Sequence, residues 1–307
     1  MQRSALVITI IGIASGVLSS GALAQTVGSA PAIPLSQPAL RAALALLEYD
    51  SSIPLNVSLL GTTRAASNTQ ERLAFSGWRT RVPAYLWIPN AAPRPMPVVI
   101  LAHAGNSSKE TFLRPDGPER GSRLLDSLLA AGFAVFAADL QGHGERTAYN
   151  DYLPLATLYF DRGWMRRFRD LAAESAVDLR RALDYLSTRT DFDTRRVAIV
   201  GYSMGGLTAS IASAADARIT ATVLCVPAIM DTLVFPYRPL DLASAFADRS
   251  LLVLAGRSDE LFPLGQTRAF VDAVPGNRHS LVLFDSGHQL PAAYVDSTVT
   301  WLRRTLR

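Results

Sequence analysis

The stretch of sequence that decides the fold runs from Val197 to Gly206 and reads VAIVGYSMGG. Its first four residues are apolar and predict a short buried strand. The next residues match the pattern Gly-x-Ser-x-Gly, and the apolar spacing of residues 207–215 predicts a helix. A strand, a tight turn and a helix thus follow one another, with Ser203 at the turn.

Sterics explain why glycine stands on both sides of Ser203, at positions 201 and 205. The turn is so tight that side chains two residues before and two residues after the serine would collide. Ser203 is therefore expected in a strained backbone conformation, with its hydroxyl exposed above a sheet. The bare pattern would occur by chance in roughly one chain in ten of this size, so the strand and the helix around it carry the argument.

The same alternation of strand and helix extends on both sides of this motif. Apolar runs typical of strands covered on both faces occur at residues 98–102, 133–138, 197–200, 219–224, 251–255 and 280–284. Helical periodicity occurs at residues 122–131, 170–187, 207–215, 265–273 and 292–306. We therefore expect an α/β fold with a mostly parallel central sheet and helices on both faces. Such sheets bind ligands at the carboxyl ends of their strands.

The N-terminal third of the chain follows a different pattern. Residues 39–47 are expected to form a short helix, and residues 55–60, 71–75 and 81–88 to form antiparallel strands. Residues 61–70 and 76–80 are rich in turn-forming residues. No boundary divides residues 39–307, so we expect a single domain there.

Residues 1–24 have the layout of a secretory signal peptide. A positive start at Arg3 precedes an apolar run, and Ala22-Leu23-Ala24 is a cleavage pattern of small residues. The alternative is an uncleaved membrane anchor, because residues 5–24 are about long enough to span a bilayer. Cleavage near Ala24 would leave a Pro-, Ser- and Ala-rich tether at residues 25–38, and an exported protein in the periplasm or outside the cell. No stable membrane association is expected after cleavage.

Composition excludes several classes of protein. The 307 residues are 49% hydrophobic and 18% charged, which excludes intrinsic disorder. Cys225 is the only cysteine, so the chain has no disulfide framework, no cysteine-based zinc site and no iron–sulfur cluster. The net charge is +4, and the arginines are interspersed with 26 acidic residues rather than clustered. This distribution favours a solvated surface over a nucleic-acid groove. The oligomeric state is left open.

A serine hydroxyl needs a base to become a nucleophile, and the chain has four histidines. His288 follows the last predicted strand by four residues, which places it at the carboxyl edge of the sheet. His103 and His143 precede Ser203 along the chain, and His279 opens the last strand at the opposite edge. His288 is therefore the predicted base.

A carboxylate must hold the imidazole in one tautomer and stabilise its positive form. Asp259 follows the strand at 251–255 and is the predicted partner of His288. Glu260, the next residue, and Asp285, close to His288 in sequence, are the alternatives.

Two N–H groups are needed to stabilise a negative oxygen in the reaction. One is the backbone amide of Met204, directly after the serine. The other is expected from the loop after residues 98–102, with Gly105 favoured over Ala104 and Asn106. His103 is expected to pack beneath that loop rather than to act as a base.

Several segments resemble the α/β-hydrolase superfamily, and within it the dienelactone-hydrolase-like and acyl-peptidase-like serine hydrolases. These segments are Arg81–Pro89 (RVPAYLWIP), His103–Glu110 (HAGNSSKE), Ala138–Glu145 (ADLQGHGE), Asp191–Arg196 and Gly256–Asp259. The chain order Ser203, Asp259, His288 is also the order of that superfamily.

Two positions depart from the pattern of the group. The loop after residues 98–102 reads His103-Ala104 where the group usually has His-Gly. The nucleophile is Ser203 rather than the cysteine of true dienelactone hydrolases. Asp139, Gly142 and Gly144 are expected to shape a turn.

The resemblance and the residues together imply a carboxylic-ester hydrolase that works through an acyl-enzyme on a small-molecule ester, without a metal or organic cofactor. A serine peptidase and a non-catalytic binding protein are the alternatives. Aromatic residues at 149–169 and 227–248 are candidate substrate contacts, with core packing as the alternative explanation. They are Phe160, Trp164, Phe235 and Tyr237.

Overall fold

A computed structural model describes residues 33–115, 117, 119–150, 165–229 and 234–307. Within these residues the strands form one nine-stranded sheet. The strands are β1 (Ser58–Arg64), β2 (Asn68–Ser76), β3 (Arg81–Pro89), β4 (Met96–Ala102), β5 (Ala134–Ala138), β6 (Phe192–Tyr202), β7 (Ile219–Cys225), β8 (Ser250–Gly256) and β9 (His279–Phe284).

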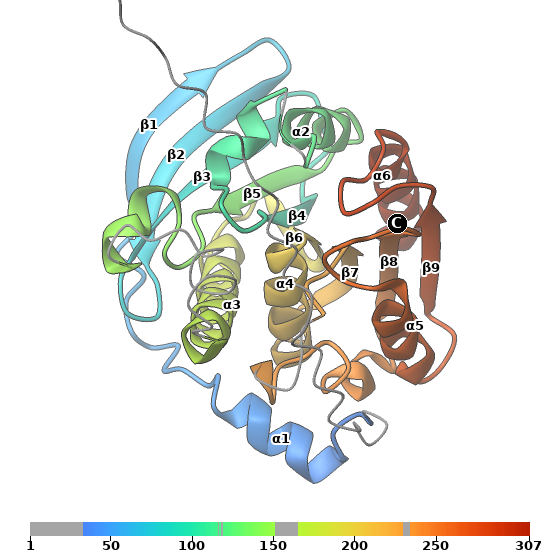
Figure 1. Cartoon of the computed structure of the whole chain (residues 1–307). Helices are drawn as coiled ribbons and strands as arrows, with labels where there is room; N and C mark the ends of the chain where they lie inside the picture. Colours follow the sequence, from blue (N-terminus) through green and yellow to red (C-terminus); the bar gives the residue numbers. More distant parts are fainter. Residues whose placement is uncertain (1–32, 116, 118, 151–164, 230–233) are drawn as a thin grey trace, which may run out of the picture. The chain divides into compact units, whose positions relative to one another are not determined.

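The sheet has an antiparallel edge and a parallel body. Its order is β1-β2-β3-β5-β4-β6-β7-β8-β9, and Figure 1 shows it from the blue N-terminal strands to the red C-terminal ones. Strands β5, β4, β6, β7, β8 and β9 pair in parallel, whereas β1, β2 and β3 pair antiparallel, as does β3 with β5. Every residue of β5 is buried, and every residue of β1 is exposed. The predicted α/β fold with a mostly parallel sheet is confirmed.

Helices cover both faces of the sheet. They are α1 (Gln37–Ala45), α2 (Gly121–Ala130), α3 (Met165–Ser187), α4 (Met204–Ala215), α5 (Leu264–Ala273) and α6 (Ala293–Thr305). Short 3₁₀ helices are η1 (Lys109–Leu113), η2 (Gly144–Asn150) and η5 (Ala243–Phe246). One hydrophobic cluster contains residues of α1, α3, α4 and α5, and the other contains residues of α2 and α6. Two helical layers therefore enclose the sheet.

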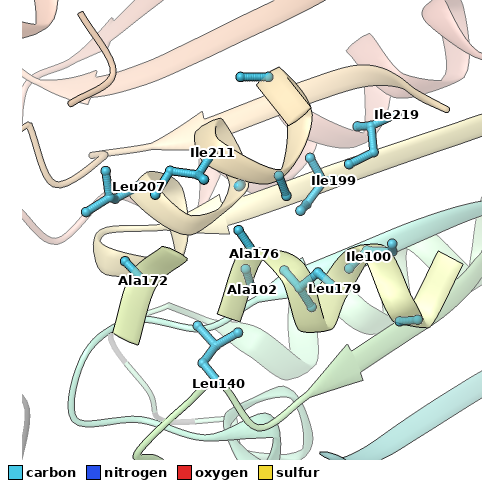
Figure 2. Close-up of a cluster of buried hydrophobic side chains, with 14 of the residues drawn as sticks. Ile100, Ala102, Leu140, Ala172, Ala176, Leu179, Ile199, Leu207, Ile211 and Ile219 are labelled. Atoms are coloured by element: carbon cyan, nitrogen blue, oxygen red, sulfur yellow. The ribbon is translucent and has the colours of Figure 1, made fainter. Parts of the chain in front are cut away.

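The packing of α3 and α4 against the central strands positions the functional turn. Leu207 and Ile211 of α4 are fully buried, as is Ile199 of β6. Figure 2 shows the labelled side chains of this cluster, which come from α3, α4, the neighbouring strands and the loop after β5: Ile100, Ala102, Leu140, Ala172, Ala176, Leu179, Ile199, Leu207, Ile211 and Ile219. Because α4 starts directly after Ser203, burial of its apolar side fixes where the serine lies.

The N-terminal strands differ from the prediction. The strand expected at residues 55–60 forms at Ser58–Arg64, and β2 starts at Asn68, so residues 61–70 are mostly strand and not a turn. The apolar pattern failed here because β1 has no buried face. It is held by backbone pairing to β2, from Ser58 opposite Ala74 to Arg64 opposite Thr69.

Three helices begin two or more residues earlier than predicted. Helix α1 begins at Gln37, so the last two residues of the predicted tether are helical. Helix α3 begins at Met165 rather than 170, and α4 begins at Met204 rather than 207.

Ile33–Arg307 form one compact unit. The predicted signal peptide lies outside the described residues. No helix in the described part of the chain is both long and apolar enough to span a membrane.

Candidate active site

Ser203 lies between the end of β6 and the first residue of α4. Its backbone has φ 55° and ψ −116°, a conformation that costs a non-glycine residue about 1–3 kcal/mol. The surrounding backbone holds it there, because Ser203 N–H donates to the carbonyl of Cys225 at 2.8 Å. The carbonyl of Ser203 in turn accepts from Ala228 N–H at 3.0 Å. The expected strained turn is present.

Backbone crowding explains the two glycines around Ser203. A Cβ atom on Gly201 would lie 2.1 Å from the carbonyl oxygen of Gly205. A Cβ atom on Gly205 would lie 2.1 Å from the carbonyl oxygen of Ala102, at the end of β4. Neither distance is compatible with a side chain. The steric reason expected from the sequence therefore holds.

His288 and Asp259 converge on this serine from two neighbouring strand ends. His288, in the loop after β9, places Nε2 2.9 Å from Ser203 Oγ. Its Nδ1 lies 2.9 Å from Oδ2 of Asp259, which follows β8. The structure thus joins the three residues singled out from the sequence into one hydrogen-bonded chain.

The environment of Asp259 keeps its carboxylate ionised. Its side chain is 3% exposed, and Oδ1 accepts the backbone N–H groups of Leu261 at 2.9 Å and Phe262 at 3.0 Å. Burial raises the pKa of Asp259, but the hydrogen bonds from His288 and from the two amides outweigh it, so the net pKa is lowered. A carboxylate held in this way stabilises a positive charge on the adjacent imidazole.

The two alternative carboxylates do not face the imidazole ring. Glu260 Oε2 accepts the backbone N–H of His288 at 3.1 Å. Asp285 is 91% exposed in its side chain and pairs with Arg257 at 2.8 Å. Glu260 therefore supports the loop of His288, and Asp259 alone of the three contacts the ring.

The loop that carries His288 is held by Tyr202 and Gly256. The Tyr202 hydroxyl donates to the His288 carbonyl at 3.0 Å and accepts from Leu290 N–H at 2.9 Å. A Cβ atom on Gly256 would lie 2.1 Å from the carbonyl oxygen of Gly287, so only glycine fits there. Sequence reasoning missed Tyr202, whose only signal is its position directly before the serine.

The loop after β4 lies against the start of α4. A Cβ atom built on Gly105 would be 3.8 Å from Cβ of Met204, so the two predicted N–H donors come from adjacent pieces of backbone. The Met204 amide belongs to the first turn of α4, where N–H groups have no partner within the helix.

His103 orients the amide of Gly105. Its Nε2 accepts from Leu140 N–H at 3.1 Å, so Nδ1 carries the proton and donates to the Ala104 carbonyl at 2.8 Å. In a trans peptide the N–H points opposite to the C=O, so the Gly105 N–H points away from His103. Burial lowers the pKa of His103 well below its usual range, with His143 as a further cause. His103 is thus a neutral residue beneath the loop, as expected.

A family comparison matches this architecture. The model of the alpha/beta hydrolase family matches residues 99–305, which is more than half of the chain. The chain belongs to the alpha/beta hydrolase family. The matched residues include the serine turn, Asp259 and His288.

Individual relatives agree with this assignment. YtaP of Bacillus subtilis (strain 168), whose name describes it as a hydrolase, is 27% identical over 180 residues, which is 56% of this chain. The chain spans 58% of the length of that curated relative.

Solved structures share the fold at lower identity. A cold-adapted esterase from an Arctic intertidal metagenomic library matches with a TM-score of 0.66 at 21% identity, covering 81% of this chain and 100% of that one. A Klebsiella pneumoniae protein named as a dienelactone hydrolase matches with a TM-score of 0.58 at 19% identity, covering 81% and 98%.

The turn at residues 139–144 of this hydrolase fold serves as an anchor for the loop after β4. Asp139 is fully buried and accepts from Lys109 N–H at 2.9 Å and from Lys109 Nζ at 2.8 Å. Lys109 Nζ also donates to Glu145 at 2.7 Å. The only lysine of the chain thus ties η1 to this turn. Asp139 shapes the turn, as expected.

The structure describes two of the four predicted substrate contacts, Phe235 and Tyr237. Tyr237 is 5% exposed and its hydroxyl donates to the Ala43 carbonyl of α1 at 3.2 Å, so it is a core residue and not a substrate contact. Phe235 is 51% exposed, and its role stays a prediction. Phe160 and Trp164 lie outside the described residues.

Among the described residues, no group of three or more His, Cys, Asp or Glu residues could hold a metal ion.

Gly201→Ala tests the steric basis of the serine turn. We expect a loss of more than about 3 kcal/mol in the free energy of unfolding, because the new Cβ would meet the Gly205 carbonyl and the backbone has no room to shift. Gly265→Ala in α5 is the matched control. No atom lies within 4 Å of its added Cβ, so it should be neutral or stabilising by about 0.5–1 kcal/mol. Equal denaturant midpoints for the two variants would contradict the steric account.

Proposed function

We propose that the protein is a serine esterase that cleaves carboxylic esters of small molecules through an acyl-enzyme. The hydrogen-bonded chain from Ser203 Oγ through His288 to Asp259 carries this proposal, because it supplies a nucleophile, its base and the group that orients the base. The name of the Arctic metagenomic neighbour, an esterase, favours ester substrates.

In the acylation step, Ser203 Oγ attacks the acyl carbon of the ester while His288 Nε2 takes its proton. The imidazole can accept at Nε2 because Nδ1–H donates to Asp259, which then stabilises the imidazolium. The carbonyl oxygen of the substrate becomes negative. The amides of Met204 and Gly105 are placed to donate to it, and each such donor is worth about 10²–10³ in rate.

The remaining steps regenerate the enzyme. The imidazolium gives its proton to the alcohol oxygen as the ester C–O bond breaks, and the acyl group stays on Ser203. Water then attacks the acyl carbon, and His288 takes its proton and returns it to Ser203 Oγ. The products are one acid and one alcohol, so this scheme requires no metal or organic cofactor.

Cys225 is unsuited to replace Ser203 as nucleophile. It is fully buried at the end of β7, and burial raises the pKa of its thiol, with Glu119 as a further cause. A thiol kept protonated and out of reach of substrate does not attack an acyl carbon.

Hydrolysis of chromogenic substrates tests the proposed reaction. We expect the protein to release nitrophenol from 4-nitrophenyl acetate and butyrate, and Ser203→Ala to abolish the release, since it removes the nucleophile. A fluorophosphonate probe should label the unsubstituted protein but not this variant. Ser297→Ala is the control and should retain both activities, because the Ser297 hydroxyl donates to the Ala293 carbonyl of its own helix, α6.

Two outcomes would contradict the proposal. Turnover or labelling that survives Ser203→Ala would remove Ser203 from the mechanism. Cleavage of aminoacyl 4-nitroanilides without cleavage of the esters would identify a peptidase instead.

Asp259→Asn tests the carboxylate. We expect kcat to fall by about 10⁴, because the amide cannot hold the imidazole in the tautomer that accepts at Nε2. Asp285→Asn, which changes an exposed carboxylate paired with Arg257, should leave kcat within about two-fold. A large loss in the Asp285 variant together with a small loss in the Asp259 variant would reverse the assignment.

We also propose that the protein is exported, on the basis of the signal-peptide pattern at residues 1–24. Expression with its natural leader in a bacterial host should give a periplasmic or secreted protein whose N-terminus is Gln25. Intact-mass measurement of the fractions checks this. A full-length chain retained in the membrane would support the uncleaved anchor instead.

A further inference from the structure

Glu119 is a buried carboxyl group that the proposed mechanism does not use. It stands just before α2 and is 2% exposed. Both of its carboxyl oxygens are buried, and neither has a hydrogen-bond partner of good geometry in the described part of the chain. Its backbone carbonyl accepts from the Tyr294 hydroxyl. A buried carboxyl without such a partner is costly, which suggests a functional reason for keeping it.

Three hydrogen-bond donors face this carboxyl, and all three belong to the segment that follows β4. They are the backbone amide of Ala104, the hydroxyl of Ser107 and the hydroxyl of Thr111. The same segment contains Gly105, the proposed N–H donor. Glu119 therefore faces the segment that carries part of the proposed oxyanion hole.

The other neighbours of Glu119 come from the sheet, α6 and its own chain. They are Tyr202, the residue before the serine; Cys225 at the end of β7; Tyr294 of α6; and the adjacent cation Arg120. Burial raises the pKa of all three neutral groups, so none of them ionises near neutral pH. Glu119, Tyr202, Cys225 and Tyr294 also line a cavity of about 10 Å³, close to the space that one water needs.

Ionisation of Glu119 falls in the range where an esterase works. Burial raises the pKa of its carboxyl from 4.5 to about 7, and the facing Ser107, Ala104 and Thr111 lower it by less. The neutral carboxyl is a weak acceptor. The carboxylate is a strong one, because charge-assisted hydrogen bonds are shorter and about twice as strong.

We propose that Glu119 is a positioning residue whose carboxylate draws the Ala104 amide and the Ser107 hydroxyl toward it and so aligns the Gly105 amide for catalysis. The peptide after Ala104 is already oriented by His103, which bonds the Ala104 carbonyl. The carboxylate of Glu119 draws on the N–H of the peptide before Ala104, which faces it. The two residues together orient both peptides of Ala104, and only Glu119 does so in a pH-dependent way. This inference rests on the proposed hydrolase function.

The test compares pH profiles of kcat for 4-nitrophenyl acetate in three proteins. In the unsubstituted protein, log kcat on the acidic limb should rise more steeply than one unit per pH unit, because loss of the Glu119 proton adds to the single deprotonation that general-base catalysis itself requires. In Glu119→Gln the limb should have a slope of one, and kcat at pH 8 should fall by about ten-fold with little change in KM. Glu110→Gln is the matched control and should keep the steep limb, because Glu110 bonds Tyr85 instead.

A second variant alters the ionisation without removing the carboxyl. Ser107→Ala deletes a donor that lowers the pKa of Glu119, so the second ionisation on the acidic limb should move to higher pH. Identical acidic limbs in the unsubstituted protein and in Glu119→Gln would overturn the proposal.

Thermal unfolding separates failure of this proposal from failure of the proposed function. Glu119 binds its proton more tightly in the folded state, so its contribution to stability is full below about pH 4.5 and is lost as the pH rises to about 7. The Tm of Glu119→Gln minus the Tm of the unsubstituted protein should therefore rise as the pH increases through this window. Above the window this difference should stay constant. This readout needs no activity, so it holds even if Ser203→Ala retains turnover and the esterase proposal fails. A Tm difference independent of pH would contradict the ionisation of Glu119.

Discussion

The close approach of three backbone segments around Ser203 is the constraint on which the rest of the site depends. The end of β6, the first turn of α4 and the end of β4 meet so tightly that Gly201 and Gly205 have no room for a Cβ. This contact forces the positive φ of Ser203 and directs its side chain out of the sheet. It also sets Met204 beside Gly105. One steric contact therefore positions both the proposed nucleophile and the proposed oxyanion donors.

The same turn organises the base. Tyr202 immediately precedes Ser203 and bonds the backbone of the loop that carries His288, so the serine and the histidine are tied to one residue. The parallel order of β6, β7, β8 and β9 brings the strand ends to one edge of the sheet, where Asp259 completes the chain of hydrogen bonds. A parallel sheet thus brings together residues that lie 85 positions apart in sequence.

Sequence reasoning succeeded where burial or steric exclusion leaves a pattern. The apolar runs located the parallel strands, and the Gly-x-Ser-x-Gly turn with the chain order of Asp259 and His288 identified the three residues that the structure joins by hydrogen bonds. It failed for β1, whose residues are all exposed, and for Tyr237, whose aromatic ring packs in the core instead of at the site. Tyr202 contacts a loop 86–88 positions further along the chain, and a local sequence pattern does not reveal such a contact.

The central claim is that the strained Ser203 becomes covalently acylated during turnover. Brief mixing of the mature protein with 4-nitrophenyl acetate at low pH, followed by acid quenching and peptide mass analysis, tests this directly. The account predicts a single acetyl group on the peptide that contains Ser203, formed in step with an initial burst of nitrophenol. Nitrophenol release without an acetylated Ser203 peptide, or acetylation at another residue, would contradict it.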